Sequence, residues 1–514
     1  MIRLSRQSAL YGATVFLGGA VGMVLELVGS RLLAPYFGNS LFVWTALIGI
    51  MLGFMSLGNY LGGRLADKTM RDKEGLDASL IYWILIGASL GIALVSFIDS
   101  RALPALTALG SIRWGAVLGA TALFAIPCTL LGMVSPICIR FVMSRIESSG
   151  SKVGSFYALA TLGSIAGTFA GGFWLIAAIG STHLIGWLAL VPLLLAFFYL
   201  PRRRWQAWVV VLLCALMILF TLVSKPADTG QFDTSYDWYY IGETKGLVAS
   251  TEADAKRTVR YLARDYVSAE SAVYVDNGDP VVFPYYRYYD LALGQASKGD
   301  RSWTGRTLMI GGGIFSYPRH QLALYPSSSI DAVEIDPQLK EVAQSDFFLK
   351  DDPRLRIFLE DGRMFLNRGQ GSYDVVILDA FKSANSIPFQ LTTVQSMQRC
   401  SDVLSDDGVL VMNIIANALG PGSRYVSAQY QALKQVFPQV ELYYVAGSES
   451  GATGAQNISI ICSKKAGADF AAQLREQDPD LTSRTIDPTT LRSDVPALTD
   501  DFAPVDQYLI DLRS

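Results

Sequence analysis

The first half of the chain alternates long apolar runs with short polar ones. Seven apolar runs reach the length that spans the roughly 30 Å hydrocarbon layer of a bilayer. They cover residues 9–34, 41–63, 79–98, 115–136, 154–179, 184–200 and 207–223. The first run is too long for a signal peptide, and the pattern recurs six times, which favours a retained helix. Residues 1–225 are therefore predicted to form an α-helical transmembrane bundle of seven spans.

The second half alternates short apolar runs with helical patterns. Strands are expected near 307–311, 330–335, 355–358, 374–378, 408–414, 439–445 and 456–462, with helices near 337–345, 391–405 and 424–436. This alternation predicts a doubly wound, Rossmann-like α/β domain of the methyltransferase type over 306–514. Residues 226–305 carry extended, aromatic-rich pieces and read as a small β-rich region. Within it, the turn residues 276–279 between two apolar runs predict a hairpin.

Composition separates the same two halves. Hydrophobic residues make up 51% of the chain and charged residues 17%. Residues 1–226 hold 16 Lys and Arg against 7 Asp and Glu, which leaves 26 against 38 for residues 227–514. The net charge of −3 therefore combines a basic membrane half with an acidic half. Steering of a cationic substrate and ordinary solubility both account for the acidic balance.

The basic residues of the membrane half predict its orientation. Segments on the N-terminal side of the spans carry Arg3, Arg6, Arg64, Lys68, Arg71, Lys73, Arg140, Arg145, Lys152, Arg202, Arg203 and Arg204. Those on the opposite side carry Arg101, Arg113 and Lys225. The positive-inside rule then places the N-terminus of a multi-pass inner-membrane protein in the cytoplasm. Seven spans place the α/β domain outside it, whereas supply of a nucleotide-type substrate favours the cytoplasm, so both sides stay open.

Two features of the predicted spans indicate a structural or functional role. Glu26 and Arg31 lie in or near the first span, where charge is a sign of function or of a buried partner. They are separated by about 140° around a helix, so they do not simply pair with each other. The fifth span carries glycines at 163, 167 and 171, which let a neighbouring helix approach closely, more plausibly within one bundle than between subunits.

Candidate chemistry gathers at the predicted carboxyl ends of four strands. Gly311-Gly312-Gly313 follows the first strand, where backbone can approach a ligand closely. Glu334 ends the second strand, a position from which an acid holds both ribose hydroxyls. Asp336 follows it, and Asp361-Gly362 comes after the third strand. Both aspartates are also plausible helix N-caps.

Asp379 ends the fourth, wholly apolar strand. A carboxylate there would face both the sheet edge and its ligand. Metal chemistry is not expected, because the chain has only His183 and His320 and its five cysteines show no paired spacing. The four strand ends together predict a nucleoside site without a metal ion or a resident cofactor.

This constellation resembles the spermidine synthase family of aminopropyltransferases over roughly residues 235–465. The matching motifs are Ile310 to Gly313, Val333 to Asp336, Asp361-Gly362 and Tyr373-Asp374 with Asp379. The membrane-fused branch of that family is resembled more closely still. Its matching segments are Gly311 to Arg319, Asp379 to Phe381, Ile387-Pro388, Leu391 to Thr393 and Leu498 to Pro504.

The resemblance implies roles for individual residues. Glu334 would hold the ribose of decarboxylated S-adenosylmethionine, the co-substrate, and Asp361 its adenine. Asp379 would be the catalytic base toward putrescine or a similar polyamine. Tyr288-Tyr289-Asp290 stands at the family's Tyr-x-Glu, which implies Tyr288 beside the reacting amine and Asp290 on the far ammonium. A homodimer is the family's usual state.

Two positions depart from the family pattern. Ile314 replaces an acid that follows the glycines in the soluble enzymes, and Pro284-Tyr285-Tyr286 stands where another acid precedes Tyr-x-Glu. Fewer carboxylates would weaken diamine binding or change which amine fits. Asp500 and Asp501 are candidates to replace them.

Two other functions stay open at this point. An S-adenosylmethionine methyltransferase would share the fold and the role of Glu334, but it would need a cation for the methionine carboxylate, and Arg319 is the candidate near the glycines. A polyamine transporter with a non-catalytic, nucleoside-binding sensor domain is the third. No series of acids or histidines in the spans supports proton-driven transport.

Overall fold

The computed structural model describes residues 6–37, 40–72, 79–107, 112–143, 149–200, 230–234, 236–247, 254–264, 269–369, 371–380, 387–445, 456–467 and 470–510, with scattered positions between 205 and 216. The chain divides into two compact units, residues 1–238 and 239–514. The finer boundaries expected at 225/226 and 305/306 stay predictions.

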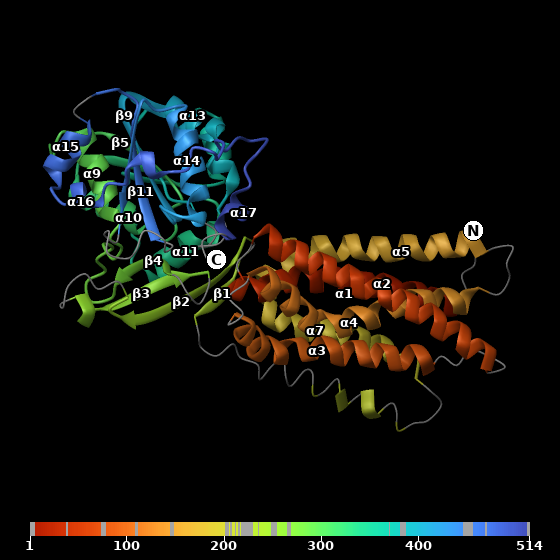
Figure 1. The fold of residues 1–514 in the computed structure, drawn as a ribbon. Helices are drawn as coiled ribbons and strands as arrows, with labels where there is room; N and C mark the ends of the chain where they lie inside the picture. The colour runs from red at the N-terminus through yellow and green to blue at the C-terminus, as the bar shows by residue number, and fades with distance from the viewer. Residues whose placement is uncertain are drawn as a thin grey trace. The chain divides into compact units, whose positions relative to one another are not determined.

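The first unit is a bundle of long apolar helices (Figure 1). Its helices are α1 (Arg6–Phe37), α2 (Leu41–Asp72), α3 (Ser79–Thr107), α4 (Ile112–Val142), α5 (Ser149–Ala170), α6 (Ile176–Ile179) and α7 (Ser181–Phe197), with a π-helical turn at Gly171–Leu175. Five helices in the described residues are long and apolar enough to cross a membrane. α7 is a shorter apolar helix at the sixth predicted span, and most of the seventh lies outside the described residues.

Small residues allow α1 and α5 to pack closely. A Cβ atom at Gly163 would collide with the Phe16 carbonyl, and one at Gly167 with the Ala20 carbonyl. These glycines therefore bring two helices of one bundle together, as their spacing predicts. Arg31 has an acidic neighbour, since its guanidinium lies 3.9 Å from Asp237.

The second unit begins with a small antiparallel sheet. It contains β2 (Trp238–Lys245), β3 (Thr258–Ala263) and β4 (Ala269–Tyr274), while the short β1 (Gln231–Asp233) precedes them. The turn after β4 forms, with Gly278 at φ +67° and its N–H donating to the Tyr274 carbonyl. The predicted hairpin is wrong, however, because no second strand follows. The chain passes Pro280 and Pro284, which cannot donate ladder hydrogen bonds, and enters α9 (Tyr286–Ser297).

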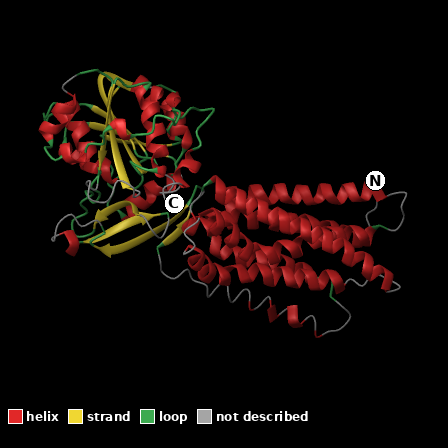
Figure 2. Cartoon of the chain, in the orientation of Figure 1, coloured by secondary structure: helices red, strands yellow, loops and turns green. Residues whose placement is uncertain are grey.

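The rest of this unit is a seven-stranded sheet covered by helices (Figure 2). Its strands are β5 (Arg306–Ile310), β6 (Ser329–Glu334), β7 (Leu355–Leu359), β8 (Tyr373–Leu378), β9 (Leu404–Ala416), β10 (Gln439–Tyr444) and β11 (Gln456–Ser463). The spatial order is β10-β11-β9-β8-β5-β6-β7. β7, β6, β5, β8 and β9 run parallel, and β11 and β10 are antiparallel additions. All seven predicted strands are present, and the Rossmann-like, methyltransferase-type fold is confirmed.

Two apolar cores lie on the two faces of this sheet. One core holds α9, α10 (Ser316–Leu324) and α15 (Phe470–Gln477). The other holds α12 (Gly362–Asn367), α13 (Val394–Val403), α14 (Arg424–Lys434) and α17 (Val505–Ile510). The remaining helices are α11 (Pro337–Asp346) and α16 (Leu481–Arg484). The central strands β5, β6, β8 and β9 are largely buried on both faces. Their sequences are therefore mostly apolar, and polar side chains are left for the strand ends.

Candidate active site

A cavity of about 250 Å³ opens at the carboxyl ends of β5, β6 and β8. Ligands of open parallel sheets bind at this edge, where the chain leaves each strand and enters the following helix. The lining contains most of the residues singled out from the sequence: Gly311, Gly313, Glu334, Asp361, Gly362 and Asp379. The topology thus brings together side chains that are far apart in the chain.

The glycine turn allows close backbone contact. Gly311 has φ +93° and Gly313 has φ +52°, which L side chains rarely adopt. A Cβ atom at Gly311 would collide with the Asp379 carbonyl. Glycine at 311 is therefore required for β5 and β8 to end side by side at the cavity.

Glu334 is buried at the end of β6 and is held by backbone donors. Its carboxylate accepts hydrogen bonds from the N–H of Gly313 at 2.8 Å and of Asp336 at 3.1 Å. Burial raises the pKa of Glu334, while the Arg264 guanidinium and the two N–H donors act against that rise. The carboxylate is thus fixed in orientation, with the cavity beside it.

The two remaining acids, Asp336 and Asp361, differ in whether they line the cavity. Asp336 is the N-cap of α11, accepts a hydrogen bond from the Gln338 N–H at 3.1 Å, and does not line the cavity. Asp361 is the N-cap of α12, where it accepts from the Met364 N–H at 2.9 Å, and it lines the cavity as well. Asp336 is therefore a helix cap that does not reach the cavity, whereas Asp361 is both a helix cap and part of the cavity wall.

Asp379 lies directly after β8, is half-buried and lines the cavity. Burial raises its pKa to about 6, and Tyr289 and Asn413 act in the opposite direction. The Asn413 side-chain amide donates to the carboxylate at 3.3 Å. A carboxyl group with a pKa near the working pH is suited to accept a proton during a reaction.

The structure places Tyr288 and Asp290 away from this wall. The Tyr288 hydroxyl donates to the Tyr444 carbonyl at 2.6 Å. Asp290 accepts from the Tyr317 hydroxyl at 3.0 Å and lies 3.0 Å from the His320 ring nitrogen. Neither lines the cavity.

Tyr285 and Tyr286, at the start of α9, line the cavity instead. With 3.6 residues per turn, positions 285, 286 and 289 share one side of α9, and positions 288 and 290 lie about 100° to either side of its middle. The helical register therefore decides which tyrosines reach the cavity.

Arg264 and Glu270 were missed by the sequence analysis. Both line the cavity, and the Arg264 Nε lies 2.9 Å from the Glu270 carboxylate. They follow β3 and belong to β4, two elements of the small sheet whose sequence carries no motif. Only the docking of that sheet over the strand ends reveals them. The amides Gln390, Asn413 and Asn457 on the lining were missed for the same reason.

Several other expected residues have partners elsewhere. Arg319 donates to the Phe347 and Gly278 carbonyls at 2.8 and 2.7 Å and is not on the cavity wall. Asp500 pairs with Arg363 at 2.8 Å. Ile314 is fully buried. The described residues contain no group of three His, Cys, Asp or Glu side chains placed to hold a metal ion.

The cavity is acidic overall. Four carboxyl groups and one guanidinium line it, and the aromatic rings of Tyr285 and Tyr286 lie on the same wall. Carboxylates and aromatic faces both attract organic cations. Such a wall is suited to an organic cation, and the strand edge beside it is suited to a nucleoside.

Comparison with known proteins agrees with this geometry. A family model described as the spermine/spermidine synthase domain matches residues 295–471. The polyamine aminopropyltransferase of Vibrio vulnificus is 32% identical over 217 residues, which is 41% of this chain and 67% of that protein. The human eEF1A lysine and N-terminal methyltransferase is 29% identical over 151 residues, 27% of this chain and 21% of that protein.

Among solved structures, a probable spermidine synthase from Corynebacterium glutamicum is 21% identical and aligns with a TM-score of 0.43, covering 53% of this chain and 96% of that one. On the family model and the Vibrio relative, this chain belongs to the spermidine synthase family and is an enzyme of the aminopropyltransferase type.

Proposed function

We propose that this protein is a membrane-bound polyamine aminopropyltransferase that uses decarboxylated S-adenosylmethionine and putrescine or a related amine. One observation carries the proposal: Glu334, Asp361 and Asp379, whose pKa is raised by burial to about 6, line one acidic cavity at the sheet edge. The apolar helices of the first unit support membrane attachment. Lipid is then the partner of the bundle, and a homodimer is the assembly we carry over from the family.

Different residues along the cavity would bind different parts of the nucleoside substrate. Glu334 would accept hydrogen bonds from the ribose hydroxyls, with its orientation set by the Gly313 and Asp336 N–H groups. Asp361 and the backbone of Gly362 would face the adenine. The sulfonium and the aminopropyl ammonium would lie toward Asp379 and the two tyrosines, because positive charge is stabilised by carboxylates and aromatic faces.

The reaction is a displacement at carbon. A bound alkylammonium is not nucleophilic, so Asp379 takes one proton from it and leaves a nitrogen lone pair. That nitrogen attacks the aminopropyl carbon next to sulfur. The new C–N bond forms as the C–S bond breaks, and the bond's electron pair returns to sulfur. The products are the lengthened polyamine and methylthioadenosine, and the alignment of the two substrates supplies much of the rate.

The test is a product assay on the full-length protein in detergent. It is incubated with decarboxylated S-adenosylmethionine and a panel of diamines and triamines, and methylthioadenosine is measured. We expect product with at least one amine, and a loss of about 10² to 10⁴ in kcat for Asp379→Asn. Asp407→Asn, which removes an exposed surface carboxylate, is the matched control and should keep full activity.

A second function is favoured by one observation. Arg264 places a cation in the cavity, which the carboxylate of intact S-adenosylmethionine would need, and methyltransferases are among the relatives. Its ion pair with Glu270 argues for the first function. Methylated amine formed from intact S-adenosylmethionine would favour methyl transfer. An absence of turnover with either nucleoside would contradict both and leave a binding domain.

A further inference from the structure

Helix contacts in the first unit fix the direction of each crossing relative to α1. α5 runs parallel to α1, because successive contacts advance along both helices. These contacts are Gly12 with Leu159, Gly163 with Phe16, and Gly167 with Ala20. α4 runs the opposite way, as shown by Gly29 with Phe124, Gly119 with Leu33, and Gly115 with Phe37.

The other two long helices follow the same alternation. α2 is parallel to α4, as shown by Gly58 with Thr129, Gly62 with Met133, and the 3.0 Å ion pair of Asp67 with Arg140. α3 is antiparallel to α4, as shown by Gly87 with Leu130, Gly91 with Ile126, and Gly119 with Leu103. α1 to α5 therefore cross the bundle in strictly alternating directions.

α7 returns the chain to the end of the bundle where α1 starts. Just after this helix, the Tyr199 hydroxyl is 2.7 Å from the Thr14 hydroxyl, and its ring stacks on Tyr11 at 5.8 Å. At its beginning, the Ser181 N–H donates to the Asp233 carboxylate at 2.8 Å. Residue 233 is therefore at the end of the bundle opposite to residue 199.

Asp237 places the chain at that same opposite end, through its ion pair with Arg31 of α1. From Thr14 to Arg31, α1 rises about 26 Å at 1.5 Å per residue, close to the thickness of the hydrocarbon layer. The chain is thus at one end of the bundle at Tyr199 and at the other end at Asp233. These two described points are separated by about the height of a bilayer.

The sequence between Tyr199 and Asp233 contains a stretch with the composition of a membrane span. Residues 207–223 contain no charged side chain. Val210 is buried in the core of the bundle, and Leu213 packs against that core. Trp208 and Leu212 are 72% and 59% exposed, as expected of side chains that face lipid.

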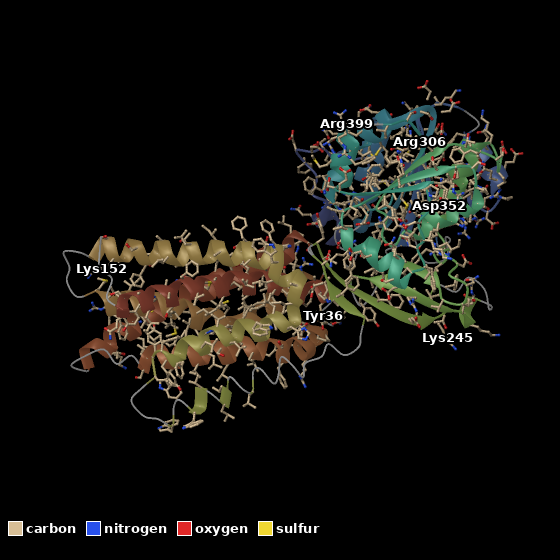
Figure 3. The ribbon with its side chains drawn as sticks, turned by 180° about the vertical axis from the view of Figure 1, so that it is seen from behind. Tyr36, Lys152, Lys245, Arg306, Asp352 and Arg399 are labelled. Carbon is tan, nitrogen blue, oxygen red and sulfur yellow. The ribbon has the colours of Figure 1, made fainter. Side chains whose placement is uncertain are left out.

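We propose that the chain crosses the membrane seven times and that the aminopropyltransferase unit stands outside the cytoplasm. The inference rests on the proposed membrane-bound function. Asp237 lies two residues before Tyr239, where the second unit begins, so the chain leaves the bundle at the end opposite the N-terminus. Figure 3 marks the two ends of the bundle, with Lys152 at the N-terminal end and Tyr36 at the opposite end.

Charge assigns the two ends to the two sides of the membrane. Helix ends and connections at the N-terminal end hold twelve Lys and Arg, against three at the opposite end, or four with Arg31 included. Cytoplasmic segments carry the basic excess. The N-terminal end is therefore cytoplasmic, and the cavity of the second unit faces the other compartment.

This placement sets a requirement on the supply of substrate. The nucleoside co-substrate is a permanent sulfonium cation, and a charge does not pass the hydrocarbon layer unaided. A carrier-mediated transport step must therefore precede the transfer reaction if the nucleoside is made in the cytoplasm. The lengthened polyamine is then released outside.

The test uses single cysteines in the full-length protein and a membrane-impermeant maleimide on spheroplasts. Gln435→Cys introduces a thiol at an exposed position just after α14, and Lys68→Cys is the matched control at the N-terminal end of the bundle. The parent protein sets the background, and the four cysteines within its described residues are buried. We expect the Gln435→Cys variant to be labelled before lysis and the Lys68→Cys variant only after permeabilisation.

The reverse pattern would overturn the proposal. Labelling does not depend on catalysis, so a labelled but inactive protein would retain the topology and remove the proposed function. An active protein whose Gln435→Cys variant is protected until lysis would retain the proposed function and overturn the proposed topology. As a second measurement, decarboxylated S-adenosylmethionine and amine added outside intact spheroplasts should yield methylthioadenosine in the medium.

Discussion

At the scale of single residues, Asp379 combines two opposed requirements. In the proposed reaction its carboxylate must ionise to act as a base, yet burial makes ionisation costly and raises its pKa to about 6. Asn413 donates to the charged form and offsets part of that cost. A carboxyl group whose pKa is raised in this way lowers the stability of the fold at neutral pH, and that effect is measurable.

Asp379→Asn should therefore raise the stability at neutral pH while it lowers kcat by about 10² to 10⁴. The folded-state pKa is about 6 and the ordinary value is 3.8, so between these values the folded protein holds a proton that the unfolded chain releases. Stability from this group is full below pH 3.8 and is lost as the pH rises through 6. The cost at neutral pH is at most about 3 kcal/mol, and less because the group opens to the cavity.

The measurement is thermal unfolding of both proteins in detergent from pH 4 to pH 8. The Asn variant should gain relative to the parent as the pH rises to about 6, with a constant difference above it. In the parent, kcat/KM should rise through the same range, because the base must be ionised. A variant that is less stable at pH 8 than at pH 4, relative to the parent, would contradict this assignment.

At the scale of elements, the register of α9 decides which tyrosines line the cavity. Tyr285→Phe removes a hydroxyl from the cavity wall and should change KM or kcat for the amine. Tyr288→Phe removes only the hydrogen bond to the Tyr444 carbonyl and should cost about 1 kcal/mol of stability with kinetics unchanged. Steady-state kinetics and thermal unfolding of the two variants show whether Tyr285 or Tyr288 faces the cavity. A kinetic defect confined to Tyr288→Phe would favour the motif-based alignment over the structure.

The glycine seam of the bundle gives a second test at this scale. Gly163→Ala would press a methyl group into the Phe16 carbonyl of α1, and overpacking of this kind costs about 1 to 3 kcal/mol. Gly154→Ala is the matched control on the same helix, because nothing lies within 4 Å of the added carbon. Melting in detergent should show a loss only for Gly163→Ala. Equal melting of both variants would exclude close packing of α1 on α5.

At the scale of the whole molecule, the chain joins a basic helix bundle to an acidic α/β enzyme unit. Charge asymmetry and apolar run length already separate the two halves in the sequence. The odd number of crossings that we propose, and with it the side of the enzyme, depends instead on contacts between distant residues such as Tyr199 with Thr14 and Asp237 with Arg31. Sidedness therefore belongs to the assembled bundle and not to any one span.

The sequence by itself determined the strands, the glycine turn and three acids of the site. Buried parallel strands must be apolar and their ends must be polar, so local pattern reports them directly. Only the tertiary structure decided that Asp336 is a cap, that Tyr285 rather than Tyr288 lines the cavity, and that Arg264 and Glu270 line it as well. Those outcomes depend on helical register and on the packing of one sheet over another, which are set by contacts between residues far apart in the chain.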